Sequence, residues 1–196
     1  PASIVIEALM ISGSIVYLVG NRNDDGSAGL GLARRGLGDN GDTTTSASVI
    51  TENDVILGDA GAPVSLIEYG DFQCPFCGRF FSQTVPLIRE NYIKTGKVKM
   101  AYRSFSFLGP ESFAAAEAAE CAKDQRQFWA YHDLLYQAEI IDGQENNGNL
   151  NREFFIDLAS QLNLNAQAFA QCIDGGKYAD AVQKASSDAR IAGVNS

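Results

Sequence analysis

Residues 66–77 read Leu-Ile-Glu-Tyr-Gly-Asp-Phe-Gln-Cys-Pro-Phe-Cys, an apolar run followed by a turn and two cysteines three positions apart. At the start of a helix, cysteines with this spacing lie on one face and can form either a dithiol or a small disulfide ring. Cys74 would occupy the helix N-terminus, where unpaired amides and the helix dipole favour a thiolate. Pro75 suits the first turn because its missing N–H is not needed there. The stretch therefore predicts a redox-active dithiol, Cys74 and Cys77, separated by Pro75 and Phe76.

The composition narrows the function classes. The chain has 196 residues, of which 45% are apolar, and a formal net charge of −9. That charge argues against nucleic acid as a partner, because no basic stripe is present to release counterions. His132 is the single histidine and is interpreted as a structural residue, so neither a His-rich metal site nor a Ser-His-Asp hydrolase is expected. A CxxC is also half of a zinc site, but the second half is absent. We expect neither a metal nor a cofactor.

The N-terminal part differs from the rest in composition. Residues 4–19 are nearly all apolar, with Glu7 as the one charge, although they fall short of the roughly 20 residues that span a bilayer. Residues 1–20 are interpreted as a partial membrane anchor or signal segment, the alternative being a buried core helix. Residues 21–48, rich in Gly, Asn, Asp, Ser and Thr, predict a flexible linker. Together these segments indicate a folded domain tied to a membrane.

The globular part is expected over residues 49–196. Strands are predicted over 64–69 and 98–103, with a helix over 74–92 that Pro86 kinks. Such a strand–helix–strand order gives a parallel pair. The pattern from residue 111 onward is helical, broken at 143–148, and predicts a helical insertion over about 111–192. Its expected helices lie near residues 113–121, 128–136, 154–162, 166–173 and 178–192.

These residues resemble the DsbA-like branch of the thioredoxin-fold disulfide oxidoreductases, over about residues 53–196. The resemblance implies an α/β, thioredoxin-like fold with an inserted helical domain. A lone CxxC would be a weak signal, but this one stands in matching flanking sequence and in the same order. The matching pieces are Gly61-Ala62-Pro63-Val64, residues 68–77, Ala118-Ala119-Glu120-Cys121-Ala122, Phe128-Trp129, Gly175-Gly176-Lys177-Tyr178 and Gly193-Val194-Asn195-Ser196.

One departure from the family pattern concerns the end of the sequence. In this family a turn containing Gly-Val leads into a cis-proline segment that faces the CxxC and lines the substrate site. Here Gly193-Val194 is followed only by Asn195 and Ser196. We therefore expect a C-terminally truncated fragment in which the C-terminal part of the sheet and half of the substrate groove are missing.

The helix positions of the two thiols, and the resemblance in the case of Glu68, assign roles to residues of the site. Cys74 would be the exposed nucleophile, with a pKa in the roughly 3.5–7.5 range of activated CxxC thiols, and Cys77 the more buried resolving thiol. Phe76 would offer the thiolate neither positive charge nor a hydrogen bond. Glu68 stands where the family places a buried acid that exchanges protons with the resolving cysteine. The alternative for Glu68 is an ordinary, solvated glutamate at a strand end.

Cys121 and Cys172 form the second pair and lie in two helices of the predicted insertion. A structural disulfide between them is favoured, and the closed loop would then contribute roughly 4 kcal/mol at most. Two alternatives stay open, namely two core thiols and a second redox pair.

The sequence and the resemblance together predict a membrane-tethered, extracytoplasmic thiol–disulfide oxidoreductase of the bacterial periplasm or cell envelope. Its expected partners are exported proteins with cysteine pairs, a membrane or soluble redox partner that reoxidises it, and the membrane itself through the N-terminal segment. A reductase or isomerase of the same fold would differ only in redox poise. The alternative from another class is a non-catalytic, thioredoxin-like binding module.

Overall fold

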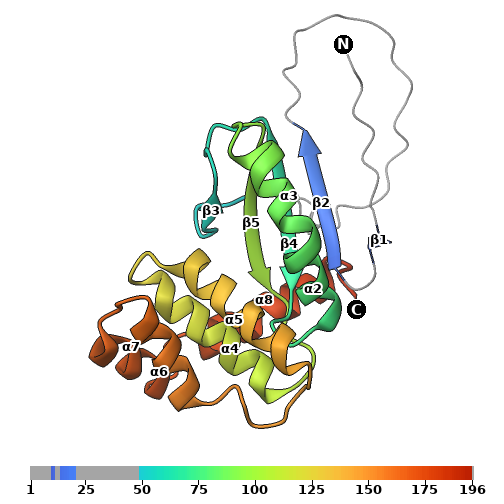
Figure 1. Cartoon of the computed structure of the whole chain (residues 1–196). Coiled ribbons are helices and arrows are strands. Elements are labelled where there is room, and N and C mark those ends of the chain that lie inside the picture. The colour runs from blue at the N-terminus through green and yellow to red at the C-terminus, as the bar shows by residue number, and fades with distance from the viewer. Residues whose placement is uncertain (1–9, 12–13, 21–48, 196) are drawn as a thin grey trace, which may run out of the picture.

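The chain folds around one mixed sheet with helices packed on it (Figure 1). The computed structural model describes residues 10–11, 14–20 and 49–195. The strand order is β1-β2-β4-β5-β3, and only the β4–β5 pair is parallel. The strands are β1 (Met10–Ile11), β2 (Ser14–Gly20), β3 (Ile56–Leu57), β4 (Val64–Gly70) and β5 (Val98–Ser104).

Strands β4 and β5 form the centre of the sheet and confirm the predicted strand–helix–strand unit. Leu66 and Ile67 are both buried but pack into different clusters, because successive side chains of a strand point to opposite faces. Leu66 packs with Val85 of α3 (Val85–Ile88), and Ile67 packs with Ala189 of α8 (Ala179–Ile191). Both faces of the sheet are therefore covered by helix.

The helical run between the two strands covers residues 75–93 but is not a uniform α-helix. It consists of α2 (Pro75–Arg79), the π-helical turn η1 (Phe80–Thr84), α3 and a second π-helical turn, η2 (Arg89–Ile93). Pro86 lies one residue after the first residue of α3. A proline inside an α-helix clashes with the carbonyl four residues earlier, and a wider π turn relieves that clash. The disturbance expected at Pro86 is thus a local widening of the helix.

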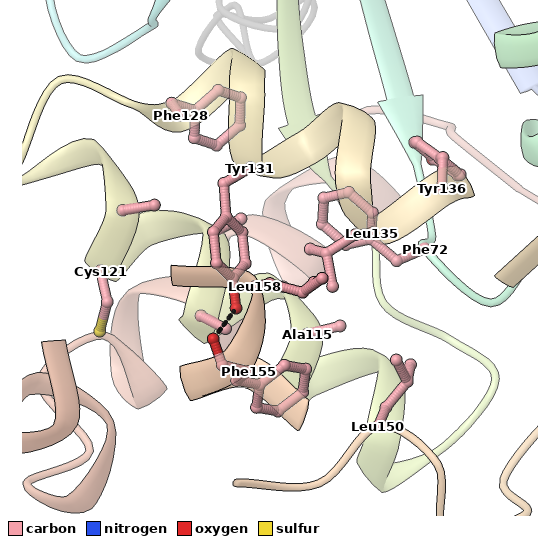
Figure 2. Packing of buried hydrophobic residues seen from close by; sticks show 14 of the residues in the cluster. Phe72, Ala115, Cys121, Phe128, Tyr131, Leu135, Tyr136, Leu150, Phe155 and Leu158 are labelled. Carbon is pink, nitrogen blue, oxygen red and sulfur yellow. Dashed lines mark hydrogen bonds between the residues drawn. The ribbon is translucent and has the colours of Figure 1, made fainter. Parts of the chain in front are cut away.

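The predicted helical insertion is confirmed, and Figure 1 shows most of it as a block at the end of the sheet toward which β5 points. Figure 2 shows Tyr131 and Leu135 facing Phe155 and Leu158, with the Tyr131 hydroxyl donating a 3.0 Å hydrogen bond to the Phe155 carbonyl. This apolar cluster continues to Phe72, next to the CxxC. The helices of this part are α4 (Pro110–Lys123), α5 (Phe128–Asp142), α6 (Arg152–Gln161), α7 (Ala166–Asp174) and α8.

The apolar N-terminal segment, for which an anchor is predicted, is described by the structure only at residues 10–11 and 14–20. Ser14–Gly20 is a strand that pairs antiparallel with β4, so that Ile15 lies opposite Tyr69 and Gly20 opposite Val64. The segment is rich in β-branched residues, which suit strands, and β4 has an edge that β5 does not cover. Among the described residues, no helix is both long enough and apolar enough to cross a bilayer. The predicted linker, residues 21–48, lies outside the described residues.

Candidate active site

Cys74 lies directly after the turn that follows β4 and is the N-cap residue of α2. Its backbone is extended, with φ −70° and ψ 118°, and its carbonyl accepts a 2.9 Å hydrogen bond from Gly78 N–H. Pro75 occupies the first turn of α2. The Cys74 sulfur therefore belongs to a helix N-terminus, as the motif predicts, and the amides of that turn are directed toward it.

The two thiols have different surroundings. Cys74 is 5% exposed and Cys77 is fully buried, so Cys74 is less exposed than the sequence predicted. The hydrogen bond from the Cys77 thiol is the largest influence on the pKa of Cys74, and it lowers that pKa. Burial opposes it, while the backbone N–H groups of Cys77 and Phe76 lower the pKa further, so that it falls to about 7. At neutral pH a large share of Cys74 is therefore thiolate, the form that attacks disulfides.

Access to Cys74 is through a pocket of about 250 Å³ between α2 and the C-terminal end of α5. Gln73, Ser82, Glu139 and Ile140 are among its lining residues. The sequence did not point to Glu139. This residue lies 65 positions from Cys74, and nothing in its helical segment distinguishes it from an ordinary glutamate on a helix. Burial raises the pKa of Glu139 to about 7, although a hydrogen bond from Asn149 opposes the shift.

Phe76 is 44% exposed beside the site and lies under the guanidinium of Arg79, 5.5 Å from the ring centroid. Arg79 thus places a positive charge over the Phe76 ring, three residues later on the same helix. A cation over an aromatic face contributes about 0.5–1 kcal/mol at an exposed site. Phe76 and Arg79 together give the surface near the dithiol an apolar and a cationic component.

The segment before the dithiol is fixed by Asp71. Its Oδ1 accepts a 2.9 Å hydrogen bond from the backbone N–H of Gln73, and its Oδ2 accepts hydrogen bonds from the N–H groups of Phe107 and Leu108, at 2.8 and 3.1 Å. Asp71 is buried, so these donors compensate its loss of hydration. It ties the CxxC turn to the loop that precedes α4.

Gly70 permits the close packing behind this turn. A β-carbon at this position would lie 2.7 Å from a ring carbon of Tyr102 and 2.8 Å from the Tyr136 hydroxyl. The two hydroxyls lie 3.2 Å apart, and the Tyr136 hydroxyl donates to the Asp71 carbonyl at 3.3 Å. Tyr102 of β5 and Tyr136 of α5 therefore support the turn from the sheet and from the helical block.

Glu68 is buried in β4, which agrees with the buried acid of the resemblance and not with a solvated strand-end residue. It is 1% exposed, and neither carboxyl oxygen has a hydrogen-bond partner among the described residues. Burial raises its pKa to about 8; Arg89 opposes the shift, and the charges of Cys74 and Asp133 add to it. Glu68 is thus electrostatically coupled to the dithiol and titrates near neutrality, as a proton carrier must.

Cys121 and Cys172 form a disulfide that joins α4 to α7, with their Cα atoms 5.9 Å apart. The bond belongs to the core of the helical block, away from the residues that line the Cys74 pocket. His132 is fully buried among aromatic rings. In the described part of the chain, no three His, Cys, Asp or Glu side chains come together as a metal site would require.

A second and larger cavity, of about 740 Å³, lies between β5 and α8. Arg103 and Tyr178 are among its lining residues, and none of the predicted site residues is. Its size does not make it the reactive site, because its lining, among the residues that the structure describes, includes no thiol with a lowered pKa. The chemistry of the chain therefore centres on the smaller pocket.

Comparison with known proteins agrees with this geometry. The thioredoxin family matches residues 50–196. A curated relative, the probable disulfide bond formation protein D of Bacillus anthracis, is 38% identical over 91 residues, which cover 45% of this chain and 42% of the relative. The disulfide bond formation protein D of Bacillus subtilis is 33% identical over 107 residues, covering 54% and 48%. The chain thus spans about half the length of the curated relatives it matches.

Solved structures give the same assignment. The crystal structure of Wolbachia pipientis alpha-DsbA1 matches with a TM-score of 0.69 and 27% identity, covering 79% of this chain and 76% of that one. Oxidised BdbD from Bacillus subtilis matches with a TM-score of 0.65 and 28% identity, covering 72% and 76%. With its CxxC at a helix N-terminus and a helical block inserted after the second central strand, the chain belongs to the thioredoxin family, in its DsbA-like branch.

Proposed function

We propose that the chain is a thiol–disulfide oxidoreductase that passes a Cys74–Cys77 disulfide to cysteine pairs of exported proteins. The observation that carries this proposal is the Cys74 thiol, which belongs to the N-cap residue of a helix, lines a pocket and has a pKa lowered to about 7. A low thiol pKa makes Cys74 a good leaving group and a reactive nucleophile. The relatives named disulfide bond formation protein D support the same chemistry.

The exchange consists of two displacements and moves two electrons in total. A client thiolate attacks the Cys74 sulfur of the oxidised protein, a mixed disulfide forms, and the Cys74–Cys77 bond breaks. Cys77 leaves as a thiolate and takes up one proton, for which Glu68, a buried carboxyl group whose pKa is raised in part by the charge of Cys74, is the proposed donor. The second client thiolate then attacks the first client sulfur and releases Cys74, so the client becomes a disulfide and the protein a dithiol. A redox partner must reoxidise Cys74 and Cys77.

The direction of exchange depends on the reduction potential of the dithiol. A thiolate stabilised at Cys74 stabilises the reduced form, which favours donation of the disulfide to clients. Equilibration with glutathione at pH 7 measures the potential. A value near about −270 mV, as for thioredoxin, would contradict the donor role and assign a reductase.

Mixed-disulfide trapping tests the activity itself. Cys77→Ser leaves the mixed disulfide at Cys74 without an intramolecular resolving thiol, so a cysteine-containing peptide should accumulate as a Cys74 adduct. Cys74→Ser is the matched control and should give no adduct. If neither variant forms an adduct and Cys74→Ser keeps biological function, the chain is a binding module and not an enzyme.

We also propose an extracytoplasmic location with a tether in residues 1–20. The Cys121–Cys172 disulfide favours an oxidising compartment, because cytosolic proteins seldom keep such bonds. The tether competes with the pairing of β2 and β4, since one segment cannot do both at once. Deleting residues 1–20 separates the two roles. Release from membranes with an unchanged unfolding midpoint supports the tether, whereas a lowered midpoint shows that β2 belongs to the sheet and contradicts it.

A further inference from the structure

Beneath the dithiol lie polar atoms that the fold leaves unpaired. Both carboxyl oxygens of Glu68 and Nε2 of His132 are buried without a hydrogen-bond partner in the described part of the chain. A buried polar atom left unpaired costs about 1–3 kcal/mol. Proteins retain such atoms where strain, chemistry or a bound solvent molecule requires them. The two side chains come from different elements, β4 and α5. That both lack a partner therefore suggests a shared role.

Tyr102 connects the two groups in space. It is the register partner of Glu68 across the β4–β5 pair, so both side chains point to the same face of the sheet. Its ring packs edge-on against His132, with the ring centroids 4.8 Å apart. Its hydroxyl lies 3.2 Å from that of Tyr136, which donates to the Asp71 carbonyl. Glu68 and His132 therefore both neighbour one aromatic ring whose own polar atom is already engaged.

The opposite side of His132 leads to the surface. Nδ1 lies 2.9 Å from Oδ1 of Asp133, and that carboxylate is held by the guanidinium of Arg89, with Nη2 2.7 Å from Oδ1. The Asp133 side chain is 23% exposed and so reaches solvent. Burial raises the pKa of Asp133, but hydrogen bonds from His132 and Arg89 hold it below its usual value. An ionised Asp133 accepts the proton on Nδ1, which leaves the lone pair on the buried Nε2.

The charges around His132 come from several elements. Asp133 and Tyr136 lie on its own helix, Arg89 on η2, and Tyr102 on β5. Burial lowers the pKa of His132, Asp133 raises it, and Arg89 lowers it. Arg89 and Asp133 also act on Glu68, with opposite signs, and Cys74 acts on Glu68 as well. The dithiol, Glu68, His132 and the Arg89–Asp133 pair thus belong to one electrostatic cluster.

We propose that His132 relays protons between Glu68 and the solvent-exposed Asp133, an inference that rests on the proposed function. When the dithiol is reoxidised, Glu68 passes its proton through one bound water molecule to Nε2, because the two unpaired groups are not within direct hydrogen-bond distance. The resulting Glu68 carboxylate then takes the proton of the Cys77 S–H. The imidazolium then releases its Nδ1 proton to Asp133 and to solvent. When a client is oxidised, the protons move inward along the same atoms. Each transfer moves one proton and no electrons, and His132 acts only through Glu68.

A double-mutant cycle tests the relay. Glu68→Gln, His132→Phe and the double variant are compared in the rate of oxidation of a two-cysteine peptide between pH 5 and 9. Loss of general acid–base transfer costs at least about 10²-fold, so Glu68→Gln should slow the reaction strongly and His132→Phe by about 10-fold or more. Because the two groups act in series, the double variant should be no slower than Glu68→Gln alone.

Two further variants separate the relay from packing. His132→Asn keeps a donor toward Asp133 but cannot carry a proton inward, so it should be slow while unfolding near the wild-type midpoint; it also serves if His132→Phe fails to fold. Phe81→Leu perturbs a ring whose centroid is 5.8 Å from His132, and its effect should multiply with that of Glu68→Gln. If the wild type is active and the fold-losses in rate of His132→Phe and Glu68→Gln multiply in the double variant, the relay is overturned but the proposed function is not. An inactive wild type would overturn the proposed function.

Discussion

The side-chain oxygen of Gln73 accepts a 2.6 Å hydrogen bond from the backbone N–H of Asn146, 73 positions away. The amide nitrogen of Gln73 donates to the Ser112 hydroxyl at 2.8 Å. One side chain next to the nucleophile thus connects the start of α4 with the loop after α5. The helical block is therefore attached to the sheet at the active site itself, and the position of Cys74 depends on both.

Gln73→Ala should destabilise the domain because it removes both hydrogen bonds and leaves the buried Ser112 hydroxyl without its donor. A buried partner left unpaired costs about 1–3 kcal/mol, and urea unfolding at pH 7 measures the loss. The exposed Gln137 of α5 provides the control, since Gln137→Ala should change stability by less than about 0.5 kcal/mol. Equal stability of the two variants would show that Gln73 does not attach the helical block.

Periodicity and turn residues predicted β4, the helical run after it, β5 and every helix from α4 to α8, because each has a long, regular apolar pattern. They missed β3, which has two residues and no period to detect. The π turns were also missed, since Pro86 predicts a disturbance but not its form. The pairing of β2 with β4 was also missed, because an apolar run without strict alternation does not by itself predict a strand.

Within the site, residues close to the CxxC in sequence were predicted and distant ones were not. Helix geometry alone places Cys74 at an N-terminus, and the resemblance assigned a role to Glu68. Glu139 and Asn146 join the site only through the packing of α5 against α2, which no local pattern reveals. The role of Asp71 could have been predicted from the sequence. An acidic residue between Gly70 and Phe72 in an apolar segment is expected to be buried, and a buried carboxylate needs hydrogen-bond donors.

The pKa of Cys74 should depend on whether residue 77 can donate a hydrogen bond, because that bond is the largest influence lowering it to about 7. Cys77→Ala removes the donor and should raise the pKa toward the free-cysteine value of about 8.5, whereas Cys77→Ser keeps a hydroxyl donor and should raise it less. The pH dependence of Cys74 alkylation by iodoacetamide measures both. Coinciding midpoints for the wild type and the two variants would contradict the role of Cys77.

Glu68 should make the domain less stable as the pH rises. Its folded pKa, about 8, lies above the ordinary value of 4.5, so the unfolded chain loses this proton first. The stabilising contribution is complete below pH 4.5 and is lost between pH 4.5 and about 8, at about 1.4 kcal/mol per pH unit. Glu68→Gln should remove this slope in urea unfolding measured at about pH 5, 6 and 7.

The control for Glu68 is Glu145→Gln, a substitution at an exposed loop position, which should keep the wild-type slope. At pH 7 Glu68→Gln should be more stable than the wild type, because it no longer carries a buried carboxyl that ionises in the unfolded state. At pH 4 the two should differ little. A Glu68→Gln variant that is less stable than the wild type at pH 7 would show that the ionised carboxylate has a partner in the fold.

Loss of the Cys121–Cys172 bond should lower stability without changing the reactive thiol. The bond joins cysteines 51 positions apart, so Cys121→Ala/Cys172→Ala should cost about 4 kcal/mol at most in urea unfolding. The alkylation midpoint of Cys74 should stay where it is, because neither cysteine of this pair influences its pKa. Alkylation of the denatured wild type, without any reductant, counts its thiols. If all four cysteines are alkylated, Cys121 and Cys172 are not bonded. A purely structural bond affects folding and not thiol–disulfide exchange. If the double variant stops oxidising the peptide while the alkylation midpoint of Cys74 is unchanged, the pair takes part in electron transfer.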